Sequence, residues 1–185
     1  MGTAQAPLPV KLVVPMFTGE PELFEIAEAA LQQRFGPVDY RSPRLPFEHT
    51  DYYTPEFGPG LQRWFVALER LIDPGELASI KRWTNELELS LAREGRRRIN
   101  LDPGYVSSAK LVLATTKNHN HRIYIGQGIY AEVTLVYRDK NFRPWPWTYP
   151  DYASEAYIAI LREIRELYMA QLRRLRQEGK LERSL

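Results

Sequence analysis

The chain has 185 residues, a formal net charge of +2, 44% hydrophobic residues and no cysteine. This length and composition are typical of one soluble globular domain that needs neither disulfides nor metal to hold its core together. The lack of cysteine excludes thiol catalysis and cysteine-ligated zinc. Because no stretch has the length of a membrane span and the N-terminus lacks the regions of a secretory signal, we expect a cytoplasmic protein that does not enter a membrane.

The N-terminal part of the chain predicts a strand, a helix and a second extended segment. Residues 1–8 are small, polar and interrupted by proline, so we expect a flexible tail. The nearly continuous apolar run of residues 10–16 predicts a central strand covered on both faces. Apolar residues then recur at helical spacing from Pro21 to Gly36. Residues 38–47 return as an extended segment, and its two prolines favour the edge of a sheet.

Residues 49–60, HTDYYTPEFGPG, are rich in hydrogen-bonding side chains, proline and glycine, and predict a loop. Asp51 and Tyr53 are candidate binding residues, because binding groups are often carried by loops that a scaffold holds in place. The alternative is a surface loop packed together by its tyrosines.

Apolar residues between positions 61 and 72 fit either a helix or one face of a strand. We predict a strand, because a helix start follows at once. Asp73 with Glu76 forms an N-cap pair, and Pro74 suits the first turn of a helix that Gly95 ends.

Residues 96–138 contain most of the strand-forming pattern and most of the unusual polar residues. A turn at 102–104, an apolar strand over 109–114, a polar loop over 117–122 and a long alternating strand over 123–137 predict an antiparallel meander.

The two faces of the predicted strand 123–137 differ in character, since side chains alternate with period two. We expect one face to lie in the core. We expect the other face to be polar and aromatic, with two glycines that leave room beside the backbone. A Gly-x-Gly pair marks either a bulge or bend, or a place where a ligand approaches the backbone, and the bulge or bend is the more common. The core face holds Ile123, Ile125, Ile129, Ala131, Val133 and Leu135, and the other holds Tyr124, Gly126, Gly128, Tyr130, Glu132 and Thr134.

Four phrases in the chain carry a family resemblance: ERLIDPGELASIKRWTNELE (69–88), RRINLDPGYV (97–106), TTKNHNHRIYIGQGIYAEVTLVY (115–137) and PWTYPDY (146–152). Over roughly residues 9–168 the chain resembles an uncharacterised bacterial family, catalogued as domain of unknown function 4416. The resemblance implies no particular reaction. The sequence itself contains no GxxxxGK[ST] phosphate loop and no complete dinucleotide fingerprint.

Residues 142–152, FRPWPWTYPDY, predict an extended segment whose Trp145, Trp147 and Tyr149 either lie over a groove or, more commonly, close the core. Asp151 or Ser154 can cap the final helix. Residues 178–185 are charged and predict a tail. The helix stripe expected to pack inward is Tyr157, Ile160, Leu161, Ile164, Leu167 and Tyr168.

We therefore predict a single α+β domain over residues 9–177. Its core is expected to be ferredoxin-like, with two β-α-β units in succession, extended by the antiparallel meander and covered by the C-terminal helix. The second β-α-β unit depends on residues 61–72 forming a strand.

Two classes of function remain open, and so does the question of whether the chain is an enzyme. The first is binding of a phosphorylated or other anionic small ligand through the strand-loop-strand face of residues 110–134. The second is a non-catalytic module for RNA or a protein partner, although no RNP-type motif is present and the net charge is modest. The candidate binding residues are Asp51, Tyr53, Asn100, Asp102, Lys110, Lys117, His119, His121, Arg122, Tyr124, Tyr130 and Glu132.

His119 and His121 provide two imidazoles for a metal, with Asp102 or Glu132 as a further ligand, but the sequence has no third ligand at a suitable spacing and we predict no metal site. Cofactor and oligomeric state stay open. Glu132 is predicted to be the carboxylate that orients a ligand; the alternative is a structural ion pair with Lys110 or Arg98.

Overall fold

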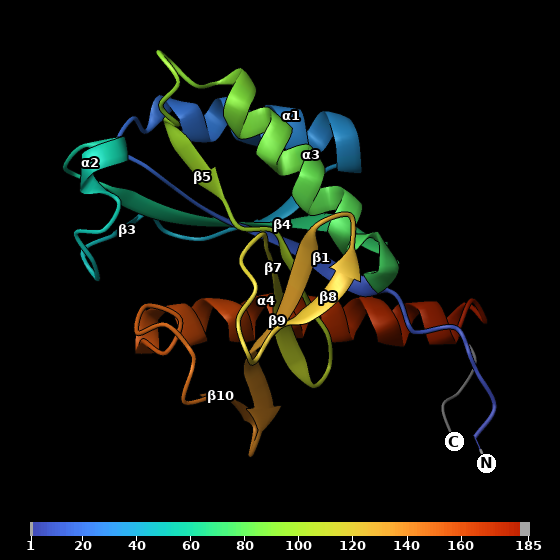
Figure 1. Cartoon of the computed structure of the whole chain (residues 1–185). Coiled ribbons are helices and arrows are strands. Elements are labelled where there is room, and N and C mark those ends of the chain that lie inside the picture. Colours follow the sequence, from blue (N-terminus) through green and yellow to red (C-terminus); the bar gives the residue numbers. More distant parts are fainter. Residues whose placement is uncertain (1, 182–185) are drawn as a thin grey trace.

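Ten strands form one sheet in the computed structural model, which describes residues 2–181 (Figure 1). All strand pairings in these residues are antiparallel. The strands are β1 (Val10–Thr18), β2 (Val38–Arg41), β3 (Leu45–Pro46), β4 (Gln62–Ile72), β5 (Ile99–Leu101), β6 (Gly104–Val106), β7 (Lys110–Thr115), β8 (Ile123–Gly126), β9 (Ile129–Arg138) and β10 (Asn141–Pro144). The helices are α1 (Glu22–Phe35), α2 (Thr54–Phe57), the short 3-10 helix η1 (Pro74–Glu76), α3 (Leu77–Ser90) and α4 (Glu155–Gln177).

The sheet is ordered β10-β9-β7-β6-β1-β4-β2, with β1 and β4 near one end and the β7-β9-β10 meander at the other. β5 pairs with the second half of β1, while β3 extends the sheet beside β4. α1 connects β1 to β2, and α3 connects β4 to β5. The predicted α+β class with a large antiparallel sheet and a C-terminal helix is therefore confirmed.

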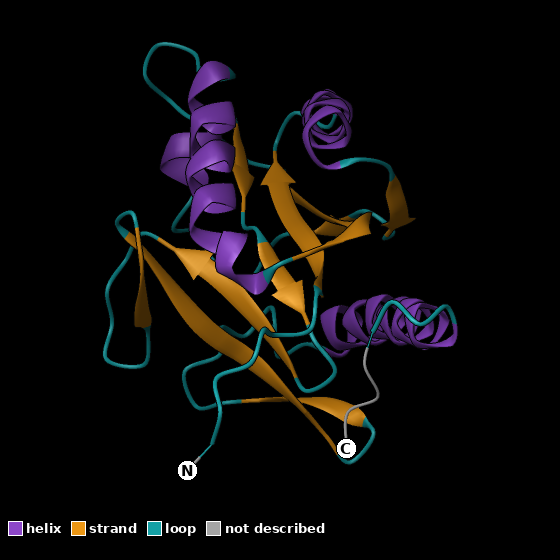
Figure 2. Ribbon diagram, turned by 90° about the vertical axis from the view of Figure 1, so that its right-hand side faces the viewer, coloured by secondary structure: helices purple, strands orange, loops and turns teal. Residues whose placement is uncertain are grey.

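Helices cover both faces of the sheet. α1 and α3 lie on one face and the long α4 crosses the opposite face (Figures 1 and 2). Alternation along β1 explains the two cores, since Leu12 and Val14 contact the α1 side and Val13 packs with the α4 side. All nine residues of β1 are buried, as expected of a central strand.

Several local predictions are confirmed by the structure. Residues 62–72 form a strand, and β2 lies at the sheet edge. Asp73 and Glu76 form the predicted capping box, although the first turn is the 3-10 helix η1 rather than part of α3. Ser154 caps α4 by accepting a hydrogen bond from the backbone of Tyr157.

The prediction of one long strand over residues 123–137 is wrong. The chain reverses at Gln127 and Gly128, so that β8 and β9 form a hairpin. Both turn residues have positive φ, 56° and 77°, which is the backbone of a type I′ turn. The bend was therefore the correct interpretation of Gly126 and Gly128.

The assignment of faces also fails on both arms of the hairpin. On β8, Ile123 is 71% exposed although it was predicted in the core, and on β9, Glu132 and Thr134 of the predicted outer face are buried. The physical reason is the hairpin: β8 lies at an edge with no layer over it, whereas β9 runs through the sheet with β7 beside it.

One smaller correction concerns the C-terminal helix. Leu167 is 38% exposed, unlike the rest of the predicted α4 stripe. The helix ends at Gln177, the last residue before the predicted tail. The division into a domain and two tails stays a prediction; residue 1 and residues 182–185 of those tails lie outside the described residues.

Gly104 in the NLDPGYV phrase has a structural role. A Cβ at this position would lie 2.2 Å from the carbonyl oxygen of Val112 on the neighbouring strand β7. Only glycine lets β6 approach β7 this closely, which explains the residue from packing alone.

Candidate functional site

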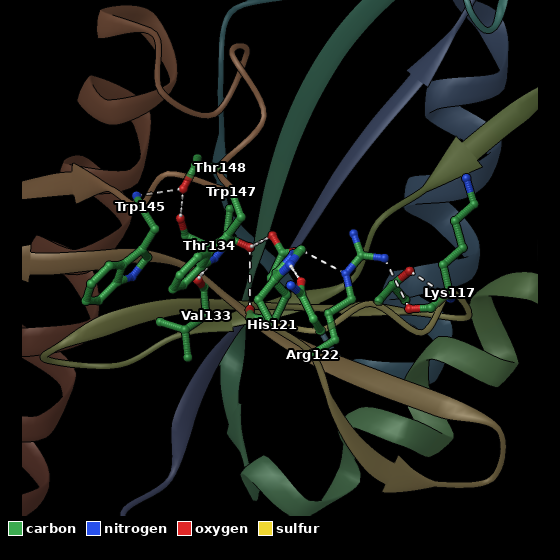
Figure 3. A network of polar contacts seen from close by, with 11 residues as sticks. Lys117, His121, Arg122, Val133, Thr134, Trp145, Trp147 and Thr148 are labelled. Carbon is green, nitrogen blue, oxygen red and sulfur yellow. Dashed lines mark hydrogen bonds and ion pairs between the residues drawn. The ribbon is translucent and has the colours of Figure 1, made fainter.

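Strand β9 has a gap along one edge. β7 covers the other edge of β9. On the edge with the gap, β8 pairs with residues 129–131 and β10 with residues 135–138, so that within the described residues Glu132, Val133 and Thr134 have no strand beside them here. Residues 145–148, which we call the strap, fill this gap with side chains (Figure 3). Trp147 Nε1 donates to the carbonyl oxygen of Val133 at 3.0 Å, and the hydroxyl of Thr148 donates to that of Thr134 at 2.6 Å.

Glu132 lies at the centre of this region and is 4% exposed. Its Oε2 accepts hydrogen bonds from His121 Nε2 at 2.9 Å and from Arg122 Nε at 2.8 Å. Its Oε1 accepts from the hydroxyl of Thr134 at 3.2 Å. Both carboxylate oxygens are thus satisfied by protein groups, and the buried charge is paired. The partners are His121 and Arg122 rather than the predicted Lys110 or Arg98.

Arg122 also closes the loop that precedes β8. Its Nη1 donates to the carbonyl oxygen of Lys117 at 3.1 Å, and its backbone NH donates to that of His119 at 3.0 Å. The loop therefore folds around the Arg122 side chain, which is only 5% exposed. The polarity of residues 117–122 predicts an exposed loop; residues 117–120 are exposed, but the side chains of His121 and Arg122 are only 19% and 5% exposed.

Four aromatic rings lie in a row at the surface beside this ion pair. The rings of His119, His121, Trp147 and Trp145 stack in that order, with centroid separations of 6.0, 5.3 and 5.1 Å and interplanar angles of 21°, 19° and 11°. We call this arrangement the ring stack. An open cleft of about 540 Å³ adjoins it, lined by Asn120, His121, Pro146 and Trp147.

The loop of residues 49–60 reaches the same region. Lys117 Nζ lies 5.4 Å from the ring centroid of Tyr52, which is 70% exposed. Tyr53 is half-buried against Phe17 and Phe47, with ring centroids 4.7 and 6.0 Å away. Burial, and secondarily the negative charge of Asp102, raises the pKa of the Tyr53 phenol to about 12. Tyr53 thus packs its own loop, as in the alternative interpretation, while Asp51 is exposed before α2.

A second polar centre lies beneath this loop around Arg63 of β4, which is 2% exposed. Its guanidinium donates to Asp102 at 3.2 Å, to Asp151 at 3.1 Å and to the hydroxyl of Tyr157 at 3.1 Å. The rings of Phe17 and Phe47 cover it at 5.1 and 4.6 Å. Burial opposes the charge of Arg63, but the surrounding carboxylates and phenols outweigh it and raise the pKa of the guanidinium. This arrangement joins β4, the link between β5 and β6, and the start of α4. The prediction of a turn at residues 102–104 is wrong, because β5 and β6 follow one another along β1.

The remaining predicted residues divide between these centres or lie apart. Asn100 is buried and accepts from Arg97 at 3.0 Å. The rings of Tyr124 and Tyr130 face each other at 5.3 Å on the β8-β9 hairpin. Lys110 lies opposite Val136, at the end of β7 away from the loop, and does not join the ring stack.

Lys117, His119, His121, Arg122 and Glu132 are therefore brought together, whereas Asp102 and Asn100 belong to other networks. Among residues 2–181, no group of three or more histidine, aspartate and glutamate side chains is arranged to hold a metal ion. The nearly parallel rings of His119 and His121 fit stacking rather than convergence on one ion.

Sequence reasoning left three residues out of the candidate site. Trp145 and Trp147 were predicted either to lie over a groove or, more commonly, to close the core, and each is 37% exposed. Their alternation with proline was the available signal in the sequence, because it predicts an extended segment whose aromatic rings can be exposed. Arg63 carried a different signal, a lone charge followed by the apolar run WFVAL.

The chain is similar to a known protein family. Residues 8–168 match the protein family described as Domain of unknown function (DUF4416). The chain belongs to this family. The matched range of the DUF4416 chain includes the loop of residues 117–122, the strap and the Arg63 centre. No curated protein and no solved structure matches this chain. Within the described part of the DUF4416 chain, none of the helices combines the length and the apolar character needed to span a bilayer.

Proposed function

We propose that this DUF4416 chain binds a small anionic ligand that carries a planar ring, as a nucleotide does, at the cleft beside the ring stack. The ring stack is the observation that carries the proposal. Stacked, partly exposed rings offer a flat apolar face to a heteroaromatic ring, at a gain of about 1–3 kcal/mol per stacked base. Trp145, the outermost ring, has one face toward Trp147 and is 37% exposed.

Rigid support for the rings favours binding over a merely exposed surface. Trp147 is hydrogen-bonded to β9 at 3.0 Å, and His121 is hydrogen-bonded to the buried Glu132 at 2.9 Å. Both rings are therefore held in place before a ligand arrives, which lowers the entropy cost of binding. Glu132 acts in this proposal by positioning His121.

Positive charge for the anionic group comes from Lys117 in the exposed loop. His119 is exposed in the same loop and has ring nitrogens that can hydrogen-bond a ligand. Arg122 is already paired with Glu132 and contributes through the position of the loop. Because Trp145 and His119 are the two ends of the ring stack, the loop attracts the anionic group of a ligand stacked on Trp145 through its electrostatic field rather than by direct contact.

One observation favours the second candidate function, binding of single-stranded RNA. The cleft is open, and a further exposed ring, that of Tyr149, directly follows the strap in the chain and is 55% exposed. A row of rings at an open surface suits successive bases of a strand.

The strand order supports the finer proposal of a ferredoxin-like core. β6-β1-β4-β2 are neighbours in that order, with α1 between β1 and β2 and α3 between β4 and β5. This is the arrangement of two interleaved β-α-β units. Location in the cytoplasm stays a prediction.

The experiment is a titration followed by tryptophan fluorescence. The probes are AMP, UMP, ribose 5-phosphate, inorganic phosphate and a ten-nucleotide oligouridylate. We expect both mononucleotides to change the emission of Trp145 and Trp147, and ribose 5-phosphate to bind at least about tenfold more weakly because it lacks the base.

Two variants test the assignment. Trp145→Ala removes the outer ring but no hydrogen bond of its side chain, so affinity is expected to fall about tenfold or more in a protein of normal stability. Trp83→Phe, on α3, is the matched control and is expected to bind as the unmodified chain does. Equal affinity of Trp145→Ala and the unmodified chain would contradict the proposal, whereas binding of the oligonucleotide alone would establish the RNA function instead.

A further inference from the structure

Strand β8 is an open edge of the sheet. Within residues 2–181 it pairs with β9 alone, so its outer backbone groups face solvent. Its residues Ile123, Tyr124 and Ile125 are 71%, 59% and 37% exposed. Because successive side chains point to opposite faces, this strand shows apolar groups on both faces as well as a free edge.

Other free edges in the sheet are protected against pairing. β2 contains Asp39 and Arg41 and is flanked by Pro37 and Pro43. β10 contains Arg143 and ends at Pro144. Charges and prolines of this kind prevent edge-to-edge association. β8 has neither, since the sequence Ile-Tyr-Ile-Gly is uncharged, and Arg122 just before it is committed to Glu132.

The sequence of β8 is symmetric about Tyr124. In an antiparallel pairing of two β8 strands centred on this residue, Tyr124 faces Tyr124, and Ile123 of each copy faces Ile125 of the other. A dimer with a two-fold axis uses the same surface patch on both copies. An apolar strand whose sequence reads the same in both directions meets this requirement by pairing with the same strand of a second copy. Apolar and aromatic cross-strand pairs also stabilise such a junction.

We infer that β8 is a self-association surface through which two copies of this chain join antiparallel, so that one sheet continues from β9 of one copy to β9 of the other. The inference is independent of the proposed ligand, because the ring stack and the strap do not belong to the strand. A four-residue junction is small, so the dimer is expected to form in the micromolar range rather than to be permanent.

The test uses the absence of cysteine from the chain. Tyr124→Cys places one thiol on each copy at the two-fold axis, where directly opposed residues have Cα atoms about 4.5–5.5 Å apart and fit a disulfide. Leu89→Cys, on the exposed face of α3 and 68% exposed, is the matched control for random collision. Both proteins are oxidised at equal concentration, and covalent dimer is measured on a non-reducing gel.

We expect Tyr124→Cys to form covalent dimer at least about tenfold faster than Leu89→Cys. Sedimentation of the unmodified chain over a concentration series is expected to show dimer formation, which Ile123→Lys abolishes and Leu89→Lys leaves unchanged. Equal cross-linking of the two cysteine variants, or an unmodified chain that stays monomeric at the highest concentration, would overturn the inference. Circular dichroism confirms that each variant is folded.

Discussion

Glu132 and Arg122 form an ion pair in which both side chains are almost inaccessible, 6% and 5% exposed, with Oε2 and Nε 2.8 Å apart. A pair in this environment is asymmetric in its energetics. Its formation contributes little net stability, but loss of one member leaves the other charge buried without a counterion.

Replacement of Glu132 by Gln is therefore expected to lower the free energy of unfolding by about 3 kcal/mol or more. The amide keeps the shape but cannot neutralise Arg122. Urea denaturation measures the change. Glu25→Gln is the control, because the Glu25 side chain is 61% exposed in its pair with Arg44, and a loss below about 1 kcal/mol is expected there. A loss that small at Glu132 would show that solvent reaches the pair.

Arg63→Met is expected to cost about 3–5 kcal/mol, since Asp151, 9% exposed, loses its counterion. The double variant Arg63→Met with Asp151→Asn removes both charges and is expected to recover part of that loss. A double-mutant cycle on the free energies of unfolding gives the coupling. Strictly additive losses would mean that the two side chains do not depend on each other.

Tyr53 predicts a dependence of stability on alkaline pH. Its pKa in the folded chain is about 12, against 10.0 for an exposed tyrosine. Between these values the unfolded chain has lost the phenol proton and the folded chain keeps it, so the free energy of unfolding falls as pH rises through this window. Below pH 10 both states are protonated and the effect vanishes. Tyr53→Phe, which keeps the ring contacts, is expected to lose less stability than the unmodified chain between pH 9 and pH 11 in urea denaturation. Equal losses of stability in the two proteins over this pH range would show that the Tyr53 phenol ionises in the folded chain as readily as in the unfolded chain.

Gly104→Ala is expected to destabilise the sheet by about 3 kcal/mol, because the new methyl group would overlap the carbonyl oxygen of Val112. The melting temperature measures this change. Gly58→Ala is the control: φ is +79° there and nothing lies within 4 Å of the added carbon, so only backbone strain of about 1 kcal/mol is expected. Similar decreases in melting temperature for the two variants would mean that β6 and β7 move apart at little cost in free energy.

Much of the fold could be predicted because local signals agreed with tertiary packing. The capping box at Asp73 and Glu76 located a helix start, and that start correctly made residues 62–72 a strand. The hairpin at Gln127 and Gly128 was missed for a physical reason. A type I′ turn prefers asparagine or aspartate before its glycine, and glutamine gave no such signal.

The site was only partly predictable. Glu132 was recognised as a carboxylate that needs a partner, but its partners come from positions 121 and 122, and only the β8-β9 reversal brings them back to it. Trp147 was missed because its contact is a side-chain hydrogen bond to a gap in the sheet, and no periodic pattern encodes such a gap. Proline and aromatic residues in alternation predicted an extended segment without deciding whether its rings lie over a groove or close the core.

The partners of Arg63 lie 39, 88 and 94 residues later in the chain. At synthesis rates of about 5–20 residues per second, Tyr157 follows Arg63 after an interval on the order of 5 to 20 seconds. Asp102, 39 residues after Arg63, is synthesised well before Asp151 and Tyr157, so the guanidinium gains its partners in two stages. Completion of this polar network therefore waits for the first turn of α4 to be synthesised.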